Sequence, residues 1–380
     1  MKRVLAIILI VMMAAGFAAG CNNDPPPASP PPTSAAPSAS PDSPSPTQAS
    51  PSQSPQSPAS PDSGDETPET EPPEPEPVRP YPIMISANEL QGMIDDPNLV
   101  LIGLINPTAA LVPFSNAANP IRGSYLIWND ELYGPCPEAV SPSLAFGRMP
   151  LGDMEALLSR AGITADSTVV VYASDYPSIG ARAAWHLSLL GLNVRFLDGG
   201  VAAWRAIKGN TGSSTRLTGE SVKNDFKVTD YDPTLIHNAT IEMVIEALQN
   251  PDEWVVIDTR ADNEYNGERG GTGSYGTGRL IGAVHVNWEN NNNSDEMLLP
   301  EAQLRELYSF IGERKVITYC QGGVRSAYTW IVLNDLGYKV WNYDGSWIEW
   351  SFAASSAGNY ANRDLVVSLT DLWTDNNGPF

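Results

Sequence analysis

The sequence predicts an α/β fold made of two copies of one domain, each a mainly parallel sheet with helices on both faces. Short, uninterrupted apolar runs are typical of strands buried on both faces, and they occur at residues 99–102, 169–172, 254–257 and 316–319. Predicted helices alternate with these runs. In addition, residues 191–204 match residues 337–350 without a gap, which indicates an internal repeat.

Each half has the same order of elements: helix, buried strand, long loop, helix, buried strand, helix, strand, helix. In the first half, a capped helix that begins near Ser86 leads into the strand at 99–102. In the second half, a similar helix that begins near Asn238 leads into the strand at 254–257. The strand at 316–319 then feeds a loop, and a helix over 326–336 follows it. We place a linker near residues 209–224.

The first 80 residues differ in composition from the rest. Residues 1–20 have two basic residues, an apolar stretch and small residues before Cys21, which is the layout of a secretory signal. This end resembles a bacterial lipoprotein cleavage site with Cys21 as the lipid-bearing N-terminus, although an ordinary signal peptide with an incidental cysteine is the alternative. Residues 21–80, rich in Pro, Ser and acidic residues, predict a disordered stalk. We therefore expect an extracytoplasmic protein, lipid-anchored to the bacterial cell membrane.

The remaining 300 residues divide, by these signals, into a first domain over 81–212, a second over 225–355 and a C-terminal extension over 356–380. The net charge of −22 argues against a nucleic-acid partner, because no basic stripe exists to neutralise phosphates. The histidines, at positions 186, 237 and 285, have no ligand-like spacing, so we expect neither a metal nor a cofactor. Cys136 and Cys320 are the thiols other than Cys21, and their pairing has to be considered.

Cys320 opens the most informative loop, Cys-Gln-Gly-Gly-Val-Arg-Ser at residues 320–326. A cysteine between a buried strand and a helix N-terminus faces unpaired amides and the positive end of the helix dipole, and both favour the thiolate. Gly322 and Gly323 allow several amides to turn toward one anion. The two copies differ here, because the first has Ala173 in place of Cys320 and residues 103–105 in place of Asp258, Thr259 and Arg260.

The second half resembles the rhodanese family, specifically its two-domain sulfurtransferases. The resemblance rests on VVIDTR at 255–260, EY at 264–265, GRLIGAV at 278–284, CQGGVRS at 320–326 and NYDGSW at 342–347. It implies that Cys320 takes a sulfane sulfur from a small donor as a persulfide and passes it to a thiophilic acceptor such as cyanide or a thiol. It further implies that the loop binds the substrate through Gln321, Gly322, Gly323, Val324 and Arg325.

The resemblance makes Arg260 a substrate contact as well, with Asp258 and Ser326 in support. Arg260 bracing Glu264 in a salt bridge is the alternative, and we expect a structural role for Glu264 itself. A cysteine-dependent phosphatase is the rival enzyme, but phosphatase loops have five residues between Cys and Arg, and four separate Cys320 from Arg325.

Thiosulfate is the donor that two arginines favour, because it is a dianion. In 3-mercaptopyruvate sulfurtransferases, the second alternative, the loop usually lacks the arginine, and the position of a first-domain histidine is occupied here by Pro120. The neutral Gln321 weakens the case for thiosulfate. Two further readings stay open, namely a persulfide carrier or a redox-sensing binding module.

Overall fold

The computed structural model describes residues 82–105, 119–128, 133–134, 147–148, 150–174, 176–217, 223–228, 238–271, 273–354 and 373–374. The predicted signal peptide, the stalk with Cys21, and Cys136 lie outside the described residues, as does most of the predicted C-terminal extension. The described residues belong to one compact unit. Within them, no helix combines the length and the hydropathy that crossing a bilayer requires.

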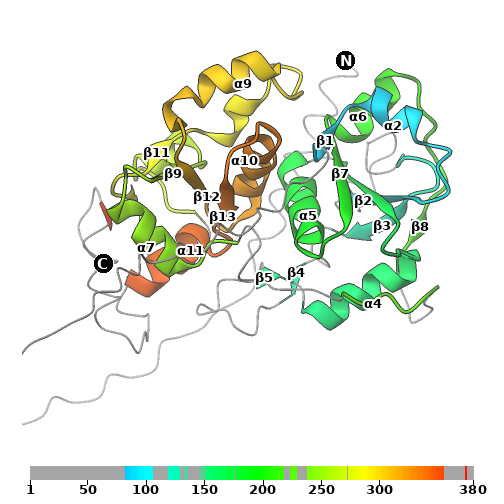
Figure 1. Cartoon of the computed structure of the whole chain (residues 1–380), viewed down its shortest axis with the longest axis horizontal. Coiled ribbons are helices and arrows are strands. Elements are labelled where there is room, and N and C mark those ends of the chain that lie inside the picture. The colour runs from blue at the N-terminus through cyan, green and yellow to red at the C-terminus, as the bar shows by residue number, and fades with distance from the viewer. Residues whose placement is uncertain are drawn as a thin grey trace, which may run out of the picture. The chain divides into compact units, whose positions relative to one another are not determined.

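The first domain is built on a parallel sheet with the strand order β1-β7-β6-β2-β3-β8 (Figure 1). Helices α4 and α5 pack against one face, and α2 and α6 cover the other. The strands are β1 (Met84–Ile85), β2 (Leu99–Ile105), β3 (Tyr125–Trp128), β6 (Thr168–Ala173), β7 (Asn193–Leu197) and β8 (Thr215–Arg216). The helices are α2 (Ala87–Gly92), α4 (Leu151–Ala161), α5 (Pro177–Leu189) and α6 (Gly200–Ala206).

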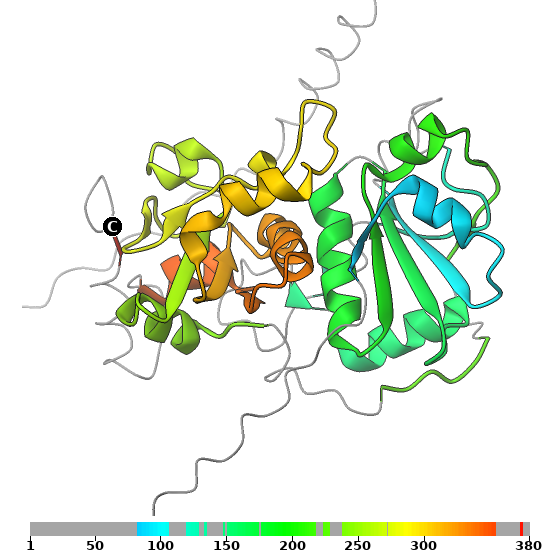
Figure 2. The same cartoon turned by 45° about the horizontal axis from the view of Figure 1, so that its top comes forward.

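The second domain, coloured from yellow-green to orange in Figure 2, has a parallel sheet in the order β11-β9-β12-β13. Its strands are β9 (Trp254–Asp258), β11 (Val284–His285), β12 (Lys315–Tyr319) and β13 (Val340–Asn342). Its helices are α7 (Ile241–Gln249), α8 (Asp262–Tyr265), α9 (Glu301–Leu307), α10 (Val324–Asp335) and α11 (Ser346–Ala354), with short 3₁₀ turns at Trp288–Asn291 and Ser309–Ile311. Two small antiparallel pairs complete the list: β4 (Tyr133–Gly134) with β5 (Gly147–Arg148), and β10 (Arg279–Leu280) with β14 (Trp373–Thr374).

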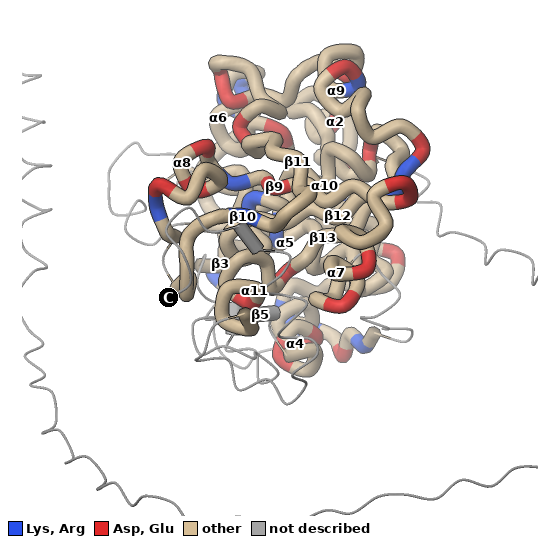
Figure 3. Tube along the Cα trace, turned by 90° about the vertical axis from the view of Figure 1, so that its left-hand side faces the viewer, with Lys and Arg blue, Asp and Glu red and all other residues tan. Residues whose placement is uncertain are grey.

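The predicted fold class is confirmed, and strand register supports the internal repeat. Gly103 pairs with Tyr172 in the first sheet, and Asp258 pairs with Tyr319 in the second. The residue after each tyrosine is therefore equivalent, so Ala173 occupies the place of Cys320. Acidic residues lie along α7 and α9 in Figure 3, and basic residues appear there as separate short segments, consistent with the negative net charge.

The predicted linker at 209–224 is wrong in part, because much of it packs on the first domain. Thr215 and Arg216 form β8 and pair with β3. Further on, the amides of Lys223 and Phe226 donate to the carbonyl and hydroxyl of Ser159 in α4. The first domain consequently extends beyond residue 212. Sequence reasoning missed this because a two-residue strand has no periodicity of its own.

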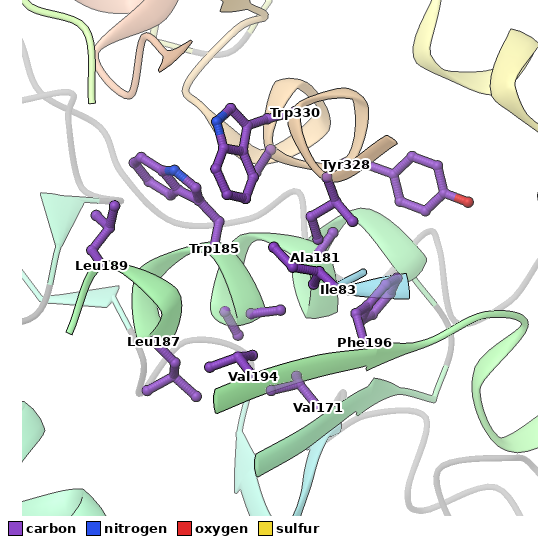
Figure 4. Close-up of a cluster of buried hydrophobic side chains, with 14 of the residues drawn as sticks. Ile83, Val171, Ala181, Trp185, Leu187, Leu189, Val194, Phe196, Tyr328 and Trp330 are labelled. Carbon is purple, nitrogen blue, oxygen red and sulfur yellow. The ribbon is translucent and has the colours of Figure 1, made fainter. Parts of the chain in front are cut away.

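The two domains meet where α5 and α10 pack side by side (Figure 4). Trp185 of α5 and Trp330 of α10 are fully buried in one continuous apolar cluster. Polar contacts flank this cluster: the Asp335 carboxylate accepts from the amide of Ile83 at 2.8 Å, and Asp198 accepts from the amide of Leu298 at 3.2 Å. A shared core of this kind holds the first domain firmly against the start of α10, where the cysteine loop lies.

Candidate active site

Cys320 lies directly after β12 and four residues before Val324, the first residue of α10. The side chain is 1% exposed. The Ser326 hydroxyl donates to its Sγ at 3.6 Å, and the Ser326 and Gly322 amides also direct hydrogen bonds to the sulfur. The predicted combination of a buried strand, a glycine turn and a helix N-terminus is therefore present around this sulfur.

Every carbonyl of the loop from residue 320 to residue 323 is held by a donor. Trp347 N–H donates to Cys320 O at 3.1 Å, and Ile348 N–H donates to Gln321 O at 3.0 Å. The Asn342 amide group donates to Gly323 O at 3.3 Å. The fourth donor, to Gly322 O at 2.8 Å, is Arg182 of the first domain. Because the carbonyls are tied down in this way, their negative ends are kept from turning toward the sulfur.

Ser346 holds the loop through hydrogen bonds to two of its backbone amides. Its buried Oγ accepts from the amides of Cys320 at 3.1 Å and Gly323 at 2.9 Å, and donates to Tyr343 O at 2.7 Å. Its φ of 51° is unusual for a residue other than glycine, and the equivalent Gly200 has the same value. A serine that keeps a glycine conformation indicates a functional demand for its hydroxyl. This residue was missed, although a serine opposite a glycine in the repeat was a visible signal.

The surroundings of Cys320 favour the thiolate. Burial raises the pKa of the thiol, but the positive charge of Arg325, the amide and hydroxyl of Ser326 and the amide of Gly322 together outweigh burial and lower it. The Gly323 amide is not part of this cradle, contrary to expectation, because it donates to Ser346. Two amides and a hydroxyl thus surround the sulfur in an environment that favours its ionised form.

Arg325, the predicted loop arginine, forms a bidentate ion pair with Glu264 of α8. Nη1 lies 2.6 Å from Oε2, and Nη2 lies 3.0 Å from Oε1. The Glu264 side chain is 4% exposed and that of Arg325 is 22% exposed. Burial raises the pKa of Glu264. The hydrogen bond and the ion pair with Arg325 lower it by more, so the net shift is downward. Glu264 is structural, as expected, but its partner is Arg325 and not Arg260.

Arg260 occupies a different place from the one expected. Its guanidinium is 1% exposed, forms three hydrogen bonds to Asp258 at 2.6–3.1 Å and donates to Gly278 O at 2.8 Å. It also lies over the Trp347 ring at 4.6 Å. Its enclosure and its pairing with Asp258 are arguments against a direct contact with a substrate. The bracing alternative fits the structure, with Asp258 as the partner.

Gln321, the residue after the cysteine, packs against the glycine-rich segment. Gln321 lies against Gly271, where a β-carbon would stand 2.2 Å from the Gln321 Cδ. The glycine-rich segment around Gly271 is tied to the second domain at Gly276, whose carbonyl accepts from Trp347 Nε1 at 3.0 Å. Gly271 is therefore a glycine because the Gln321 side chain occupies the space beside its backbone.

The fold and the site together define the class of protein. It is a duplicated parallel α/β protein in which one copy has a cysteine in an amide-lined loop and the other copy has alanine. The family model of the rhodanese-like domain matches twice, over residues 86–207 and 242–353. The chain belongs to the rhodanese family. The expected resemblance is confirmed, and with it the expectation of a sulfurtransferase-class enzyme.

Curated relatives span the same two domains. A thiosulfate sulfurtransferase of Corynebacterium glutamicum is 28% identical over 278 residues, which cover 70% of this chain and 87% of that protein. A protein of Mycolicibacterium smegmatis, to which the same name is provisionally given, is 28% identical over 282 residues, with coverage of 70% and 94%.

Solved structures with the same fold include an anaerobic ergothioneine biosynthesis enzyme from Chlorobium limicola. It is 21% identical with a TM-score of 0.56, and the match covers 71% of this chain and 68% of that one. A persulfide form of EanB, with ergothioneine bound, matches with a TM-score of 0.60 at 20% identity over the same shares of the two chains. At this identity the likeness concerns the fold alone.

Proposed function

We propose that the protein moves a sulfane sulfur from a donor, with thiosulfate as the first candidate, to a thiophilic acceptor through a persulfide on Cys320. The observation that carries this proposal is the Cys320 sulfur in a cradle of two amides and a hydroxyl, next to Arg325, where the pKa of the thiol is lowered. Such a cradle suits a single sulfur atom that stays anionic throughout the cycle. The names of the curated relatives support thiosulfate as the donor.

In the first step, the Cys320 thiolate attacks the outer sulfur of thiosulfate. A new S–S bond forms to Cys320, the S–S bond of thiosulfate breaks, and its electron pair leaves with sulfite. No proton is transferred, because nucleophile, donor, persulfide and sulfite are all anions. This agrees with a site in which arginines stand in ion pairs and no described side chain near the sulfur is placed as a general base.

In the second step, an acceptor such as cyanide attacks the terminal sulfur of the persulfide. The Cys320 S–S bond breaks, thiocyanate leaves, and the thiolate returns to the loop amides. The same amides of Gly322 and Ser326 that hold the thiolate would hold the persulfide anion, so the resting and loaded forms share one electrostatic environment.

The test is sulfur transfer from thiosulfate to cyanide by the Cys320→Ser variant. We expect activity to fall to background, because a serine hydroxyl is not ionised at neutral pH and forms no persulfide. The matched control is Cys136→Ser, which removes a thiol outside the described residues and should leave the rate unchanged. A Cys320→Ser variant with wild-type turnover would refute the proposal.

A persulfide carrier is the second candidate, and one observation favours it. Both arginines expected to attract a dianion are already paired, Arg325 with Glu264 and Arg260 with Asp258, and Gln321 is neutral. A carrier would keep the added sulfur when cyanide is present, whereas an enzyme would lose it within the time of one turnover. The mass of the loaded protein, measured in samples quenched at successive times after cyanide is added, distinguishes a carrier from an enzyme.

We also propose that the protein acts outside the cytoplasm, anchored to the membrane through lipid on Cys21. The support is the sequence of residues 1–21 and the proline-rich segment that follows. A Cys21→Ala chain should leave the membrane fraction and fail to incorporate a labelled fatty acid. Retention in the membrane with the label absent would contradict the anchor.

A further inference from the structure

We propose that Arg182, in the domain that lacks the cysteine, is a positioning residue for the Cys320 site. The inference deepens the proposed function and rests on it for the reaction, but its contacts stand on their own. Arg182 lies on α5 and is 1% exposed. Its Nη1 donates to Gly322 O at 2.8 Å, and its Nη2 lies 2.6 Å from Asp344 Oδ1. One side chain of the first domain thus contacts two parts of the second domain's site.

The repeat shows that this contact is one-sided. Arg182 and Tyr328 stand at matching positions before the equivalent glycines Gly191 and Gly337. Tyr328 donates to Asn292 Oδ1 within its own domain at 2.6 Å and makes an edge contact with the Phe196 ring. The domain with alanine in place of the cysteine therefore supplies a cation to the other domain's loop, and receives an aromatic contact in return.

The first consequence of the contact concerns one peptide group. Arg182 holds the carbonyl of the peptide between Gly322 and Gly323, and Ser346 Oγ accepts from the amide of the same peptide at 2.9 Å. A trans peptide points its carbonyl and its amide in opposite directions, so Arg182 and Ser346 form hydrogen bonds to this peptide from opposite sides. Two successive glycines rotate easily, and Gly323 has a φ of 75°. Arg182 thereby resists a rotation that would turn a carbonyl toward the sulfur.

The second consequence concerns charge. Asp344 follows β13 and its Oδ1 lies 2.4 Å from the position of a β-carbon on Gly323, so its carboxylate adjoins the loop. Arg182 pairs with this carboxylate. Without the guanidinium, an unpaired negative charge would stand against Gly323, three residues after Cys320, and disfavour the thiolate.

Arg182 is not the only charged group near the loop; the others are ion-paired or protonated, except Glu349, which ionises above a pH of about 6. Arg325 of α10 pairs with Glu264 of α8, and Arg260 pairs with Asp258 after β9. Glu349 of α11 is partly buried, and burial together with the charges of Asp344 and Glu242 raises its pKa to about 6. The phenol of Tyr319 on β12 donates to Asp258 at 2.6 Å, and burial holds its pKa well above the ordinary value. Removal of Arg182 therefore leaves the Asp344 carboxylate as one additional charge without an ion pair.

The experiment measures the pH dependence of Cys320 alkylation by iodoacetamide, followed on the peptide that contains Cys320, together with the rate of sulfur loading from thiosulfate. In the full chain, Arg182→Gln should raise the midpoint pH of alkylation by about one unit. Loading at pH 7 should slow roughly tenfold and recover as the pH rises above the new midpoint. In the double variant Arg182→Gln/Asp344→Asn, the midpoint pH should return most of the way to the wild-type value. Sulfur loading should stay slow, because Gly322 O still lacks its hydrogen bond from Arg182.

Arg205→Gln on α6 is the matched control, an arginine of the same domain for which both readouts should equal those of the wild type. An Arg182→Gln protein with unchanged midpoint and unchanged loading would overturn the proposal, as would a loss of thermal stability alone. If Arg182→Gln does not fold, Arg182→Lys is the second variant. Lysine keeps the charge but lacks the two terminal nitrogens that reach Gly322 O and Asp344, so the rate of sulfur loading should still fall several-fold. Loading at the wild-type rate would contradict the proposal. Alkylation needs no sulfur donor, so a midpoint shift in a chain that never loads sulfur would refute the proposed function and leave the role of Arg182 intact.

Discussion

Replacement of Glu264 by glutamine should improve the use of thiosulfate. Glu264 holds both terminal nitrogens of Arg325, at 2.6 and 3.0 Å, so the loop arginine presents little net charge to a donor. Glutamine keeps the size and one hydrogen-bond acceptor but removes the negative charge. The Arg325 guanidinium then acts as an uncompensated cation beside Cys320 and the incoming dianion.

The size of the effect follows from Coulomb's law. At an effective dielectric constant of about 20, one charge acting on a dianion over roughly 8–10 Å is worth about 3–4 kcal/mol before screening by salt. Arg325 is 22% exposed, and screening reduces this value to about 1–1.5 kcal/mol, or roughly tenfold in KM. The loss of the ion pair should cost about 1–2 kcal/mol of folding stability, less than for a fully buried pair.

The assay compares KM for thiosulfate with KM for an organic persulfide of lower charge, at low and at high salt, for the wild type and Glu264→Gln. We expect KM for thiosulfate to fall, the persulfide value to change little, and the difference to shrink as salt is added. A rise in KM for thiosulfate, or equal changes for both donors, would refute the reasoning, because it would mean that Glu264 positions Arg325 and does not neutralise it.

Three further changes test other parts of the site. Arg325→Ala should cost about 3 kcal/mol of folding stability, because it leaves the buried Glu264 carboxylate unpaired, and the double variant with Glu264→Gln should recover most of it in denaturant unfolding. The ion pair lowers the pKa of Glu264, so its contribution to stability should be complete above the ordinary glutamate pKa and be lost as the pH falls through the folded-state value. Glu349 has a raised pKa of about 6, so its ionisation opposes folding as the pH rises to that value. Glu349→Gln should therefore be more stable than the wild type by about 2 kcal/mol at pH 7 and equal to it near pH 4. Equal stability of the two proteins at both pH values would contradict this prediction.

The sequence predicted the parts of this molecule that depend on neighbouring residues. Apolar runs revealed the four long buried strands, and the match of 191–204 with 337–350 revealed the duplication. Strands such as β8 and β11 escaped notice because two residues carry no periodicity. The contact of Arg182 with Gly322 was beyond reach for a different reason. It joins residues 140 positions apart across two domains, and nothing near either residue in the chain indicates it.

The local geometry expected around Cys320 is present at the centre of the candidate site and differs from expectation at its edges. Cys320, Gly322 and Ser326 converge on one sulfur as the strand–loop–helix pattern implied. The family resemblance assigned Arg260 to the substrate. Because residues two apart at the end of a strand face the same way, Arg260 pairs with Asp258 instead. Alternation along a strand predicts which side a residue lies on, but not which neighbour takes up its charge.

The central claim, that Cys320 carries a sulfane sulfur, is tested most directly by the mass of the intact protein after brief exposure to thiosulfate and removal of excess donor. We expect a gain of one sulfur atom, located on the Cys320 peptide, which disappears on addition of cyanide and is absent from Cys320→Ser. An unchanged mass under conditions in which thiocyanate forms, or the same gain in Cys320→Ser, would contradict it.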